Sequence, residues 1–511
     1  MIRGGSLSKR DLFFILFTSV CLILAFPPFP LGSLAFVTLV PFYFFLQNKS
    51  LWSALRAGFL VGLIWGSGTI YWIGWATVPG LIGTLLVFAF FFAFYGFLQG
   101  WLLSRWGDRA LWSAPFIWTT MEILSGTGPA PFPWNTLANT QTFNIQPIQY
   151  VSITGMYGVT FFIVLVNVLL YRLIRTWNDV KKRILILSSL VILLVAPWIH
   201  GQFVLNKQKP YPEDLKISLV QGNVDPFKKW TSSFIDSNFV IYKSLSLQAA
   251  KEKPDLVVWP ETAAPSYLRR RTIYYRRIRD LVETINVPVL TGAPDYEWRD
   301  RGAVTFNAAF LILPERHEMD VYHKLRLVPF SEHVPFSEKL PGLFSMLDKL
   351  DLGIGHYAAG DSMTVFRFYP RNRDQEAVFS VGICYDSVFP FVIRRAFRDS
   401  ARFLIVITND GWFGDTSGPV QHAKHAILRA IENRTWIARC ANTGISEFID
   451  PLGHVVASTS YNETAVLTRT ISFTTGRSFF TEHGHLFTWF ITMVSAGIVA
   501  LSLFIRRKER I

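Results

Sequence analysis

Charged residues are scarce in this chain of 511 residues, because only 17% of its residues are Asp, Glu, Lys or Arg. Ordinary soluble domains contain about 25%. Half of the residues are hydrophobic, and the mean hydropathy is +0.30. A soluble protein of this size would need more polar surface, so the composition excludes a fully soluble protein. It also excludes intrinsic disorder and collagen-like repeats.

Cysteine is also rare, with only Cys21, Cys384 and Cys440 in the whole chain. Three cysteines are too few for a disulfide scaffold or for a four-cysteine zinc site. His422 and His425 stand three residues apart on a predicted helix, but no Cys or carboxylate completes a metal site at a familiar spacing. We therefore interpret both histidines as cap or packing residues, and we expect neither a metal nor another cofactor.

Acidic residues are nearly absent from residues 1–200, which contain four of them against twelve Lys and Arg. Apolar runs fill this region, and a membrane-spanning helix needs about 20 mostly apolar residues. We place seven runs there and an eighth near the C-terminus: Leu12–Phe26, Ser33–Gln47, Ala57–Ala76, Leu81–Leu103, Ala110–Leu124, Gln149–Leu170, Ile184–Ile199 and Leu486–Ile505. The sequence therefore predicts a seven-helix transmembrane domain over 1–200, a separate domain over 201–485, and a last transmembrane helix with a basic tail over 486–511.

The basic residues between these runs predict an orientation. With the N-terminus in the cytoplasm, the inside segments and the tail contain sixteen Lys and Arg, whereas the outside loops 27–32, 77–80 and 125–148 contain none. Cytoplasmic loops of membrane proteins carry such an excess. Eight spans then place 201–485 outside the cytoplasm. Because the positive charge flanks apolar segments rather than a folded domain, we expect no nucleic-acid partner.

Region 201–485 alternates strand-like and helix-like patterns, which indicates a layered α/β domain. Expected strands are Leu215–Val224, Asp255–Trp259, Val287–Gly292, Thr305–Leu313, Ala377–Cys384, Phe403–Thr408, Trp436–Asn442 and Ser446–Asp450. Expected helices are Ser232–Lys251, Arg271–Ile285, Val388–Asp399 and Pro419–Arg434.

Three strand ends carry residues suited to acyl transfer: Glu261, Lys324 and Cys384. Ends of buried strands are where α/β domains place reactive groups. A carboxylate can take the proton of a thiol, the thiolate can attack an ester or amide carbonyl, and an ammonium can stabilise the resulting oxyanion. Each residue alone is weak evidence, because a lone cysteine after a strand is usually a small buried apolar residue.

The segments around these residues carry a family resemblance. Pro-Asp-Leu-Val-Val-Trp-Pro-Glu at 254–261, Tyr-His-Lys-Leu-Arg-Leu-Val-Pro-Phe-Ser-Glu at 322–332 and Gly-Ile-Cys-Tyr-Asp at 382–386 resemble the three signatures of the nitrilase superfamily. The resemblance implies a four-layer α-β-β-α sandwich. It also implies that Glu261 is the proton acceptor, Lys324 the oxyanion stabiliser and Cys384 the nucleophile.

Further segments narrow the resemblance to the apolipoprotein N-acyltransferase family. They are Val-Gln-Gly-Asn-Val at 220–224, Thr-Asn-Asp-Gly-Trp-Phe-Gly-Asp at 408–415, Gly-Pro-Val-Gln-His at 418–422, Arg-Ala-Ile-Glu-Asn-Arg at 429–434, Ala-Asn-Thr-Gly at 441–444 and the loop 128–135. This family transfers an acyl chain from a phospholipid to the α-amine of a diacylglyceryl-cysteine at a lipoprotein N-terminus, through a thioester on the nucleophile. The implied setting is the bacterial inner membrane, with the catalytic domain in the periplasm.

The same resemblance suggests supporting roles for Trp230, Glu332, Tyr385 and Asp386. The second essential carboxylate of the family corresponds to Glu332, and its loop tryptophan to Trp230. One position departs from the family pattern, because Asp386 stands where the family usually has Glu. Asp is one methylene shorter, so its hydrogen bonds must differ. The expected partners are a phospholipid donor and a diacylglyceryl lipoprotein acceptor, both bound by a membrane-embedded monomer.

Several alternatives stay open from the sequence. One is a membrane-tethered amidase of the nitrilase type that acts on a small periplasmic molecule, and another is a transporter or receptor. Transporters favour polar groups inside their helices, and these helices carry almost none apart from Glu122. Glu122 itself either faces water near a helix end or has a function. The apolar segment Leu327–Leu350 either packs on the domain or forms a lid.

Overall fold

The computed structural model describes residues 7–270, 273–299, 302–334, 357–371 and 373–504. Its contacts divide the chain into two compact units. The helical unit comprises Met1–Gly74, Val78–Lys207 and His483–Ile511, and the α/β unit comprises Trp75–Thr77 and Gln208–Glu482. The basic tail after Ile505 and residues 335–350 of the predicted lid lie outside the described residues.

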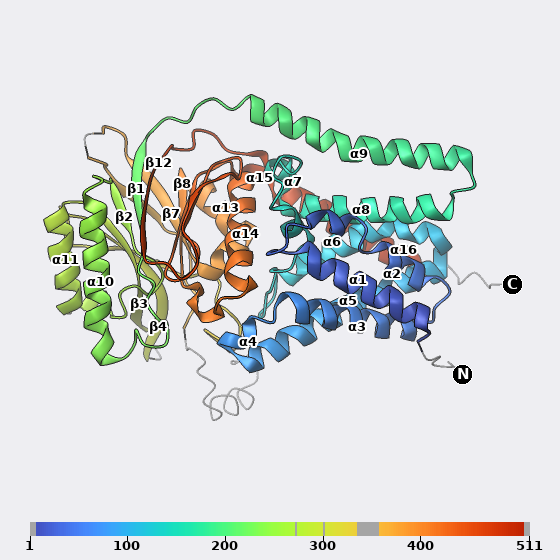
Figure 1. The fold of residues 1–511 in the computed structure, drawn as a ribbon, viewed down its shortest axis with the longest axis horizontal. Helices are drawn as coiled ribbons and strands as arrows, with labels where there is room; N and C mark the ends of the chain where they lie inside the picture. Colours follow the sequence, from blue (N-terminus) through green and yellow to red (C-terminus); the bar gives the residue numbers. More distant parts are fainter. Residues whose placement is uncertain (1–6, 271–272, 300–301, 335–356, 372, 505–511) are drawn as a thin grey trace. The chain divides into compact units, whose positions relative to one another are not determined.

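The first part of the chain is helical (Figure 1). Its elements, with the C-terminal helix α16, are α1 Lys9–Ala25, η1 Gly32–Phe36, α2 Val40–Leu46, α3 Leu51–Thr69, α4 Ile73–Ala76, α5 Val78–Trp106, η2 Gly107–Ser113, α6 Ala114–Ser125, η3 Leu137–Gln141, α7 Val151–Thr154, α8 Met156–Arg175, α9 Val180–Asn206 and α16 His485–Phe504. Four described helical stretches are long and apolar enough to cross a membrane: Val78–Ser125, Met156–Arg175, Val180–Asn206 and His485–Phe504.

Three of the expected runs are interrupted in the structure. The run Ala57–Ala76 is divided between α3, which ends at Thr69, and α4, which begins at Ile73. The segment Ser33–Gln47 forms the short 3₁₀ helix η1 and the seven-residue helix α2. The helix expected over Gln149–Leu170 is broken at Gly155, whose φ of 67° lies in the left-handed region that glycine adopts without strain. The total of eight membrane spans stays a prediction.

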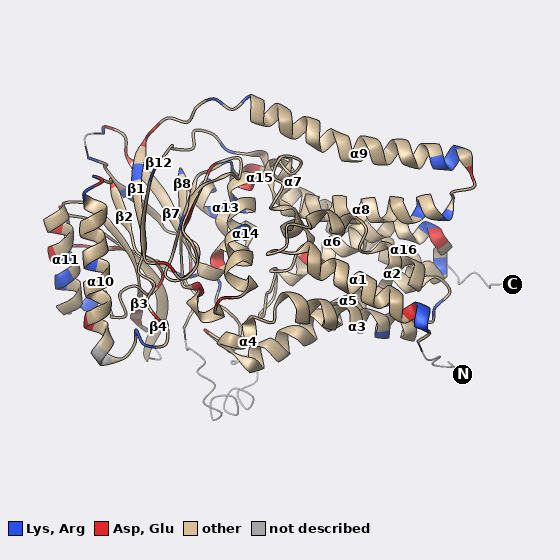
Figure 2. Ribbon diagram, in the orientation of Figure 1, with Lys and Arg blue, Asp and Glu red and all other residues tan. Residues whose placement is uncertain are grey.

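Glycines bring α3 and α5 into close contact. A Cβ atom on Gly58 would lie 2.4 Å from the carbonyl oxygen of Phe92, and one on Gly62 would lie 2.3 Å from that of Phe88. Small residues allow backbones of membrane helices to approach in this way. Figure 2 shows Lys and Arg gathered at the end of the helical unit where α1 begins and α8 meets α9.

The α/β unit contains two six-stranded sheets, in the orders β12-β1-β2-β3-β4-β5 and β11-β10-β9-β8-β7-β6. The strands are β1 Leu215–Gln221, β2 Leu256–Val258, β3 Val289–Arg299, β4 Gly302–Ile312, β5 Asp320–His323, β6 Val365–Phe368, β7 Ala377–Ile383, β8 Phe403–Thr408, β9 Ile437–Ala441, β10 Glu447–Ile449, β11 Val455–Ser458 and β12 Ala465–Ile471. The central strands β1, β2 and β3 run parallel, as do β7, β8 and β9. Parallel strands covered on both faces read as continuous apolar runs, as in Phe403–Thr408.

Helices cover the outer face of each sheet (Figure 1). The helices of this unit are α10 Ser232–Ala250, η4 Leu268–Arg270, α11 Ile273–Ile285, η5 Cys384–Val388, α13 Pro390–Arg398, η6 Asp410–Phe413, α14 Ser417–Asn433 and α15 Phe479–His483. Tyr242 of α10 and Ile278 of α11 belong to the buried cluster that includes Val257 of β2. The helices α13 and α14 pack on the other sheet. Between the sheets, the Cys440 thiol of β9 donates a hydrogen bond to the Val258 carbonyl at 3.3 Å. The predicted α-β-β-α sandwich is confirmed.

Candidate active site

Glu261 lies three residues after β2, where the chain turns sharply into Thr262 at a φ of 51°. Its carboxylate is buried and accepts two hydrogen bonds. The Nδ2 of Asn307 donates to Oε1 at 2.7 Å, and the backbone N–H of Asn409 donates to Oε2 at 2.9 Å. These two donors come from different sheets, so the fold fixes the direction in which this carboxylate points.

Lys324 follows β5 and is 1% exposed. Its Nζ lies 2.9 Å from Glu332 and 3.6 Å from Oε1 of Glu261. Burial opposes the positive charge, but the carboxylates of Glu332 and Glu261 outweigh it and raise the pKa of Lys324 above the ordinary value. Lys324 therefore carries a charge in a nearly dry environment, where an ammonium stabilises an oxyanion most strongly.

Asn307 of β4 joins the two carboxylates. Its side-chain N–H₂ donates to Glu261 at 2.7 Å and to Glu332 at 3.0 Å. Glu332 also accepts from the backbone N–H of Val328 at 2.8 Å. The sequence pattern did not identify Asn307, because it lies in the middle of an ordinary buried strand and outside the three signature segments.

Cys384 begins the turn after β7 and has a φ of 49°. A non-glycine residue in this conformation costs on the order of 1–3 kcal/mol and is typical of reactive sites. Loss of water raises the pKa of the thiol well above its ordinary value, the charge of Glu261 raises it further, and the charge of Lys324 lowers it. The thiol is therefore within the electrostatic reach of both residues.

Asp386 connects the turn that holds Cys384 to the segment that follows Lys324. Its fully buried carboxylate accepts hydrogen bonds from Tyr322 Oη at 2.8 Å, from the N–H of Ile383 at 3.1 Å, and from the N–H groups of Leu325 and Arg326 at 3.2 and 2.7 Å. Burial raises the pKa of this carboxyl to about 6 in spite of these donors. Asp386, which stands where the family pattern has Glu, thus accepts four hydrogen bonds with its shorter side chain.

His422 belongs to this site, contrary to the interpretation of the two histidines as cap or packing residues. Its Nδ1 lies 2.7 Å from Oδ1 of Asp410, and its Nε2 lies 3.2 Å from the carbonyl oxygen of Cys384. Ser387 Oγ donates to the same carbonyl oxygen at 2.7 Å. Arg439 bonds the other carboxylate oxygen of Asp410 at 2.6 Å. The Ser387 hydroxyl thus holds the carbonyl of the strained residue, and the His422 ring lies within 3.1 Å of that hydroxyl.

This arrangement also orients the next amide. A peptide unit is planar, so the N–H of Tyr385 points away from the carbonyl oxygen of Cys384. In strained nucleophile turns, the N–H after the nucleophile is a common oxyanion donor. The Tyr385 side chain is buried, and its ring packs edge-on against Phe389 at 5.0 Å.

Trp230 lies on the loop between β1 and α10 and is 42% exposed. The adjacent Lys229 is buried, its Nζ lies 5.8 Å from the centre of the Trp230 ring, and it donates to Thr262 Oγ1 next to Glu261. Burial lowers the pKa of Lys229 to about 8, against the attraction of Glu261. Lys229 is a second site residue that the sequence pattern did not identify.

One group of described residues has the composition of a metal site. A ligand atom from each of Cys384, Asp410 and His422 lies within 4.8 Å of the others. The Asp410 carboxylate, however, already bonds Arg439 and His422. The positive charge that a metal ion would supply to Asp410 thus comes from the protein itself.

The site combines a carboxylate, an ammonium and a thiol, and the thiol is on a residue with a strained backbone conformation. These groups together are suited to covalent acyl transfer. Comparison with known proteins agrees with this chemistry. Residues 18–169 match the family described as the apolipoprotein N-acyltransferase N-terminal domain, and residues 216–479 match the carbon-nitrogen hydrolase family.

Relatives that align over nearly the whole chain show to which family it belongs. The apolipoprotein N-acyltransferase of Geobacter metallireducens is 32% identical, over 99% of this chain and 97% of its own. That of Chlorobaculum tepidum is 31% identical, over 99% of each chain. A weaker likeness, with a TM-score of 0.39 and 18% identity, is to the crystal structure of Saccharomyces cerevisiae Nit3, a member of the nitrilase superfamily, over 52% of this chain and 92% of that one. On the evidence of the site and of the full-length relatives, the chain belongs to the apolipoprotein N-acyltransferase family.

Proposed function

We propose that this enzyme transfers an acyl chain from a membrane phospholipid to the α-amine of the N-terminal S-diacylglyceryl-cysteine of a lipoprotein. The observation that carries the proposal is the buried pair Glu261 and Lys324 together with the strained Cys384, in a chain that also has helices long and apolar enough to span a membrane. A water-soluble small substrate would give no reason for such helices, which disfavours the amidase alternative.

The first half-reaction forms a thioester. Glu261 takes the proton of the Cys384 thiol as the sulfur attacks the ester carbonyl carbon and forms a C–S bond. Lys324 stabilises the oxyanion of the tetrahedral intermediate. The intermediate collapses with cleavage of the ester C–O bond, and Glu261 returns the proton to the departing oxygen. A lysophospholipid leaves, and the acyl group remains on Cys384.

The second half-reaction repeats these roles with a different nucleophile. The neutral α-amine of the acceptor attacks the thioester carbonyl, and Lys324 again stabilises the oxyanion. Glu261 accepts the proton that the amine loses. The C–S bond breaks, the amide remains on the lipoprotein, and the sulfur recovers its proton from Glu261. The enzyme is then ready for another cycle.

The thioester is the test of this proposal. The purified full chain, incubated with phosphatidylethanolamine alone, should gain an acyl mass on Cys384 and release lysophospholipid. Neutral hydroxylamine should remove that mass, since thioesters are far more labile to it than amides. Cys384→Ala should never gain it, and Lys324→Ala should gain it about 10²–10³ times more slowly, which is the usual effect of removing an oxyanion donor. An unmodified Cys384 in the wild type would overturn the proposal.

The setting of the reaction is a second part of the proposal. The distribution of Lys and Arg supports a cytoplasmic N-terminus and a periplasmic α/β domain in the bacterial inner membrane. In spheroplasts, a membrane-impermeant thiol label should reach cysteines introduced within 201–485 but not one introduced within 176–182. The opposite labelling pattern would contradict both the orientation and the lipoprotein substrate.

A further inference from the structure

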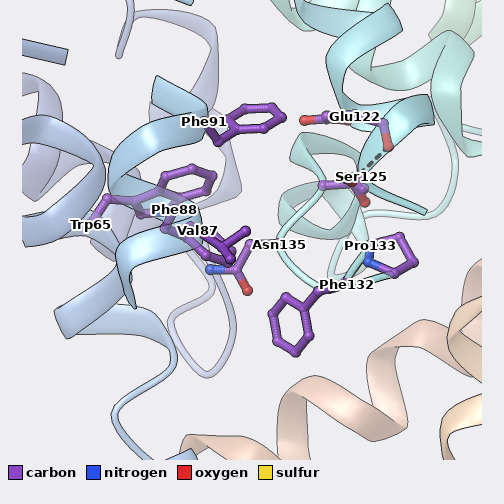
Figure 3. Close-up of a pocket in the computed structure, with 10 residues that line it drawn as sticks. Trp65, Val87, Phe88, Phe91, Glu122, Ser125, Phe132, Pro133 and Asn135 are labelled. Atoms are coloured by element: carbon purple, nitrogen blue, oxygen red, sulfur yellow. Dashed lines mark hydrogen bonds between the residues drawn. The ribbon is translucent and has the colours of Figure 1, made fainter. Parts of the chain in front are cut away.

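A small pocket in the helical unit lies among α3, α5, α6 and the loop that follows α6 (Figure 3). Its cavity volume is about 30 Å³. Ten side chains line it: Trp65, Val87, Phe88, Phe91, Glu122, Ser125, Phe132, Pro133, Asn135 and Thr136. Because about 10–15 Å³ is enough for one water molecule, the space fits one or two groups of that size.

Asn135 offers the pocket an unused acceptor. This side chain is 6% exposed, and its Nδ2 donates to Thr69 Oγ1 at 2.6 Å. Thr69 Oγ1 itself donates to the Trp65 carbonyl at 2.8 Å, so it can only accept from Asn135, and this fixes the orientation of the amide. The Oδ1 of Asn135 has no hydrogen-bond partner in the described part of the chain, and Figure 3 shows it pointing toward Phe132. A buried acceptor left unpaired destabilises the fold, so a ligand that donates to it is favoured.

Glu122 brings a carboxylate to the same pocket. It is 3% exposed and accepts from Trp118 Nε1 at 2.8 Å, from the N–H of Leu137 at 2.9 Å and from Thr160 Oγ1 at 2.6 Å. All three donors are neutral, and among the described residues no Lys, Arg or His forms an ion pair with it. A carboxylate inside a membrane unit normally has a partner of opposite charge and marks a functional site.

The rest of the lining is aromatic. Phe88, Phe91 and Phe132 surround the space beside Glu122 and Asn135 (Figure 3). The face of an aromatic ring attracts a cation, and the attraction is stronger when the cation is desolvated. A cation that also carries N–H donors would therefore satisfy the rings, the carboxylate and the unused amide oxygen together. Water could bond to Asn135 but would bring no charge to Glu122.

We infer that this pocket binds the primary ammonium group of a lipid-like ligand, with Glu122 as the counter-ion and Asn135 as a hydrogen-bond acceptor. A primary ammonium is similar in size to water and has three N–H donors. A trimethylammonium group is larger and has none, so the pocket should exclude it. The choice of ligands rests on the proposed function, because that function supplies two sources of a primary ammonium: the headgroup of phosphatidylethanolamine and the N-terminus of the diacylated lipoprotein.

The test is equilibrium binding to the full-length Cys384→Ala variant in detergent, measured by native mass spectrometry. The probes form two matched pairs: phosphatidylethanolamine against phosphatidylcholine with the same chains, and a diacylated lipopeptide against its N-acetylated form. We expect the primary-ammonium member of at least one pair to bind about tenfold more tightly, equivalent to about 1.4 kcal/mol. The pair that shows the preference identifies whether the bound ammonium belongs to the phospholipid headgroup or to the lipoprotein N-terminus. Because this variant lacks the nucleophile, the result does not depend on whether the enzyme forms a thioester.

Three substitutions test whether the preference for a primary ammonium arises in this pocket. Glu122→Gln keeps the shape and most hydrogen bonds but removes the charge, so it should abolish the preference. Asn135→Asp adds a charge at the unused oxygen and should increase the preference. Leu124→Ala, on the exposed face of the same helix, should leave it unchanged. Equal binding within both pairs in the parent, or a preference that survives Glu122→Gln, would overturn the inference. If Glu122→Gln does not fold, an unchanged preference in Asn135→Asp would overturn it.

Discussion

The helical unit and the α/β unit each bury a glutamate, but the two carboxylates have different surroundings. Glu261 in the α/β unit has the ammonium of Lys324 at 3.6 Å and two further donors. Glu122 in the helical unit has three neutral donors and no cation among the described residues. The ammonium of Lys324 can balance the charge of Glu261, whereas no cation among the described residues balances the charge of Glu122. The same side chain thus serves proton transfer in one unit and, by our inference, binding in the other.

The same substitution at both positions should separate these roles most strongly. Glu261→Gln removes the proton acceptor and should slow the acylation of Cys384 by about 10²–10⁴, the usual contribution of a general base. Glu122→Gln should leave the maximal rate of acylation within a few-fold of wild type and change only the concentration dependence on an ammonium-bearing substrate. Single-turnover acylation at varied lipid concentration measures both. An equal loss of maximal rate in Glu261→Gln and Glu122→Gln would contradict the different roles of the two glutamates.

Asp386 tests whether the link between the Lys324 and Cys384 segments matters. Asp386→Asn replaces one acceptor oxygen by a donor that faces backbone N–H groups, and hydrogen bonds to charged groups contribute about 1.5–3 kcal/mol. We expect the acylation rate to fall about tenfold to a hundredfold. Asp386→Glu keeps both oxygens, so it should retain more activity than Asn. Full activity in Asp386→Ala would show that the position only fills space.

Variants of Ser387 and His422 test whether the contacts of these side chains with the Cys384 carbonyl oxygen matter for acylation. Each single alanine variant should slow acylation about fivefold, in line with about 1 kcal/mol for one hydrogen bond. The double variant should lose less than the product of the two effects, since both side chains act on one oxygen. The Michaelis constant for phospholipid should change little. Independent, fully multiplicative losses would contradict a shared action on this carbonyl.

Lys229 should affect the pH dependence of stability rather than the rate of acylation. Its pKa in the fold is about 8, below the ordinary 10.5, so between these values the unfolded chain binds more protons than the native one. The free energy of unfolding should therefore rise with pH over this window, by up to about 3 kcal/mol. The unfolding temperature of the full chain in detergent should rise from pH 8 to pH 10 by a few degrees more in the wild type than in Lys229→Met. Equal slopes would show that Lys229 is not deprotonated by burial.

The sequence predicted the parts of the site that lie in continuous segments. Glu261, Lys324 and Cys384 each sit in a signature at a strand end, and the structure brings Glu261 and Lys324 to 3.6 Å. The alternating pattern also predicted the layered domain, because buried parallel strands are continuous apolar runs. The roles of the three residues came from the resemblance of their segments to the family signatures, and the layered domain came from local patterns.

The parts that depend on distant pairings could not be read from the pattern. Asn307 acts only because β4 lies beside the turn of Glu261, and His422 acts only because α14 packs on the turn of Cys384. The strand β12 pairs with β1, and its partly exposed residues carry no strong apolar signal. Similarly, the break at Gly155 depends on one backbone angle rather than on hydropathy.

The most direct test of the central claim is the fate of the acyl group on Cys384. Enzyme loaded with phosphatidylethanolamine and freed from excess lipid is divided between buffer, a diacylated lipopeptide with a free N-terminal amine, and the N-acetylated lipopeptide. The account predicts that only the free amine discharges the enzyme rapidly and that it yields an amide-linked third acyl chain. Release of free fatty acid at the same rate in all three samples would contradict it and would make the protein a hydrolase.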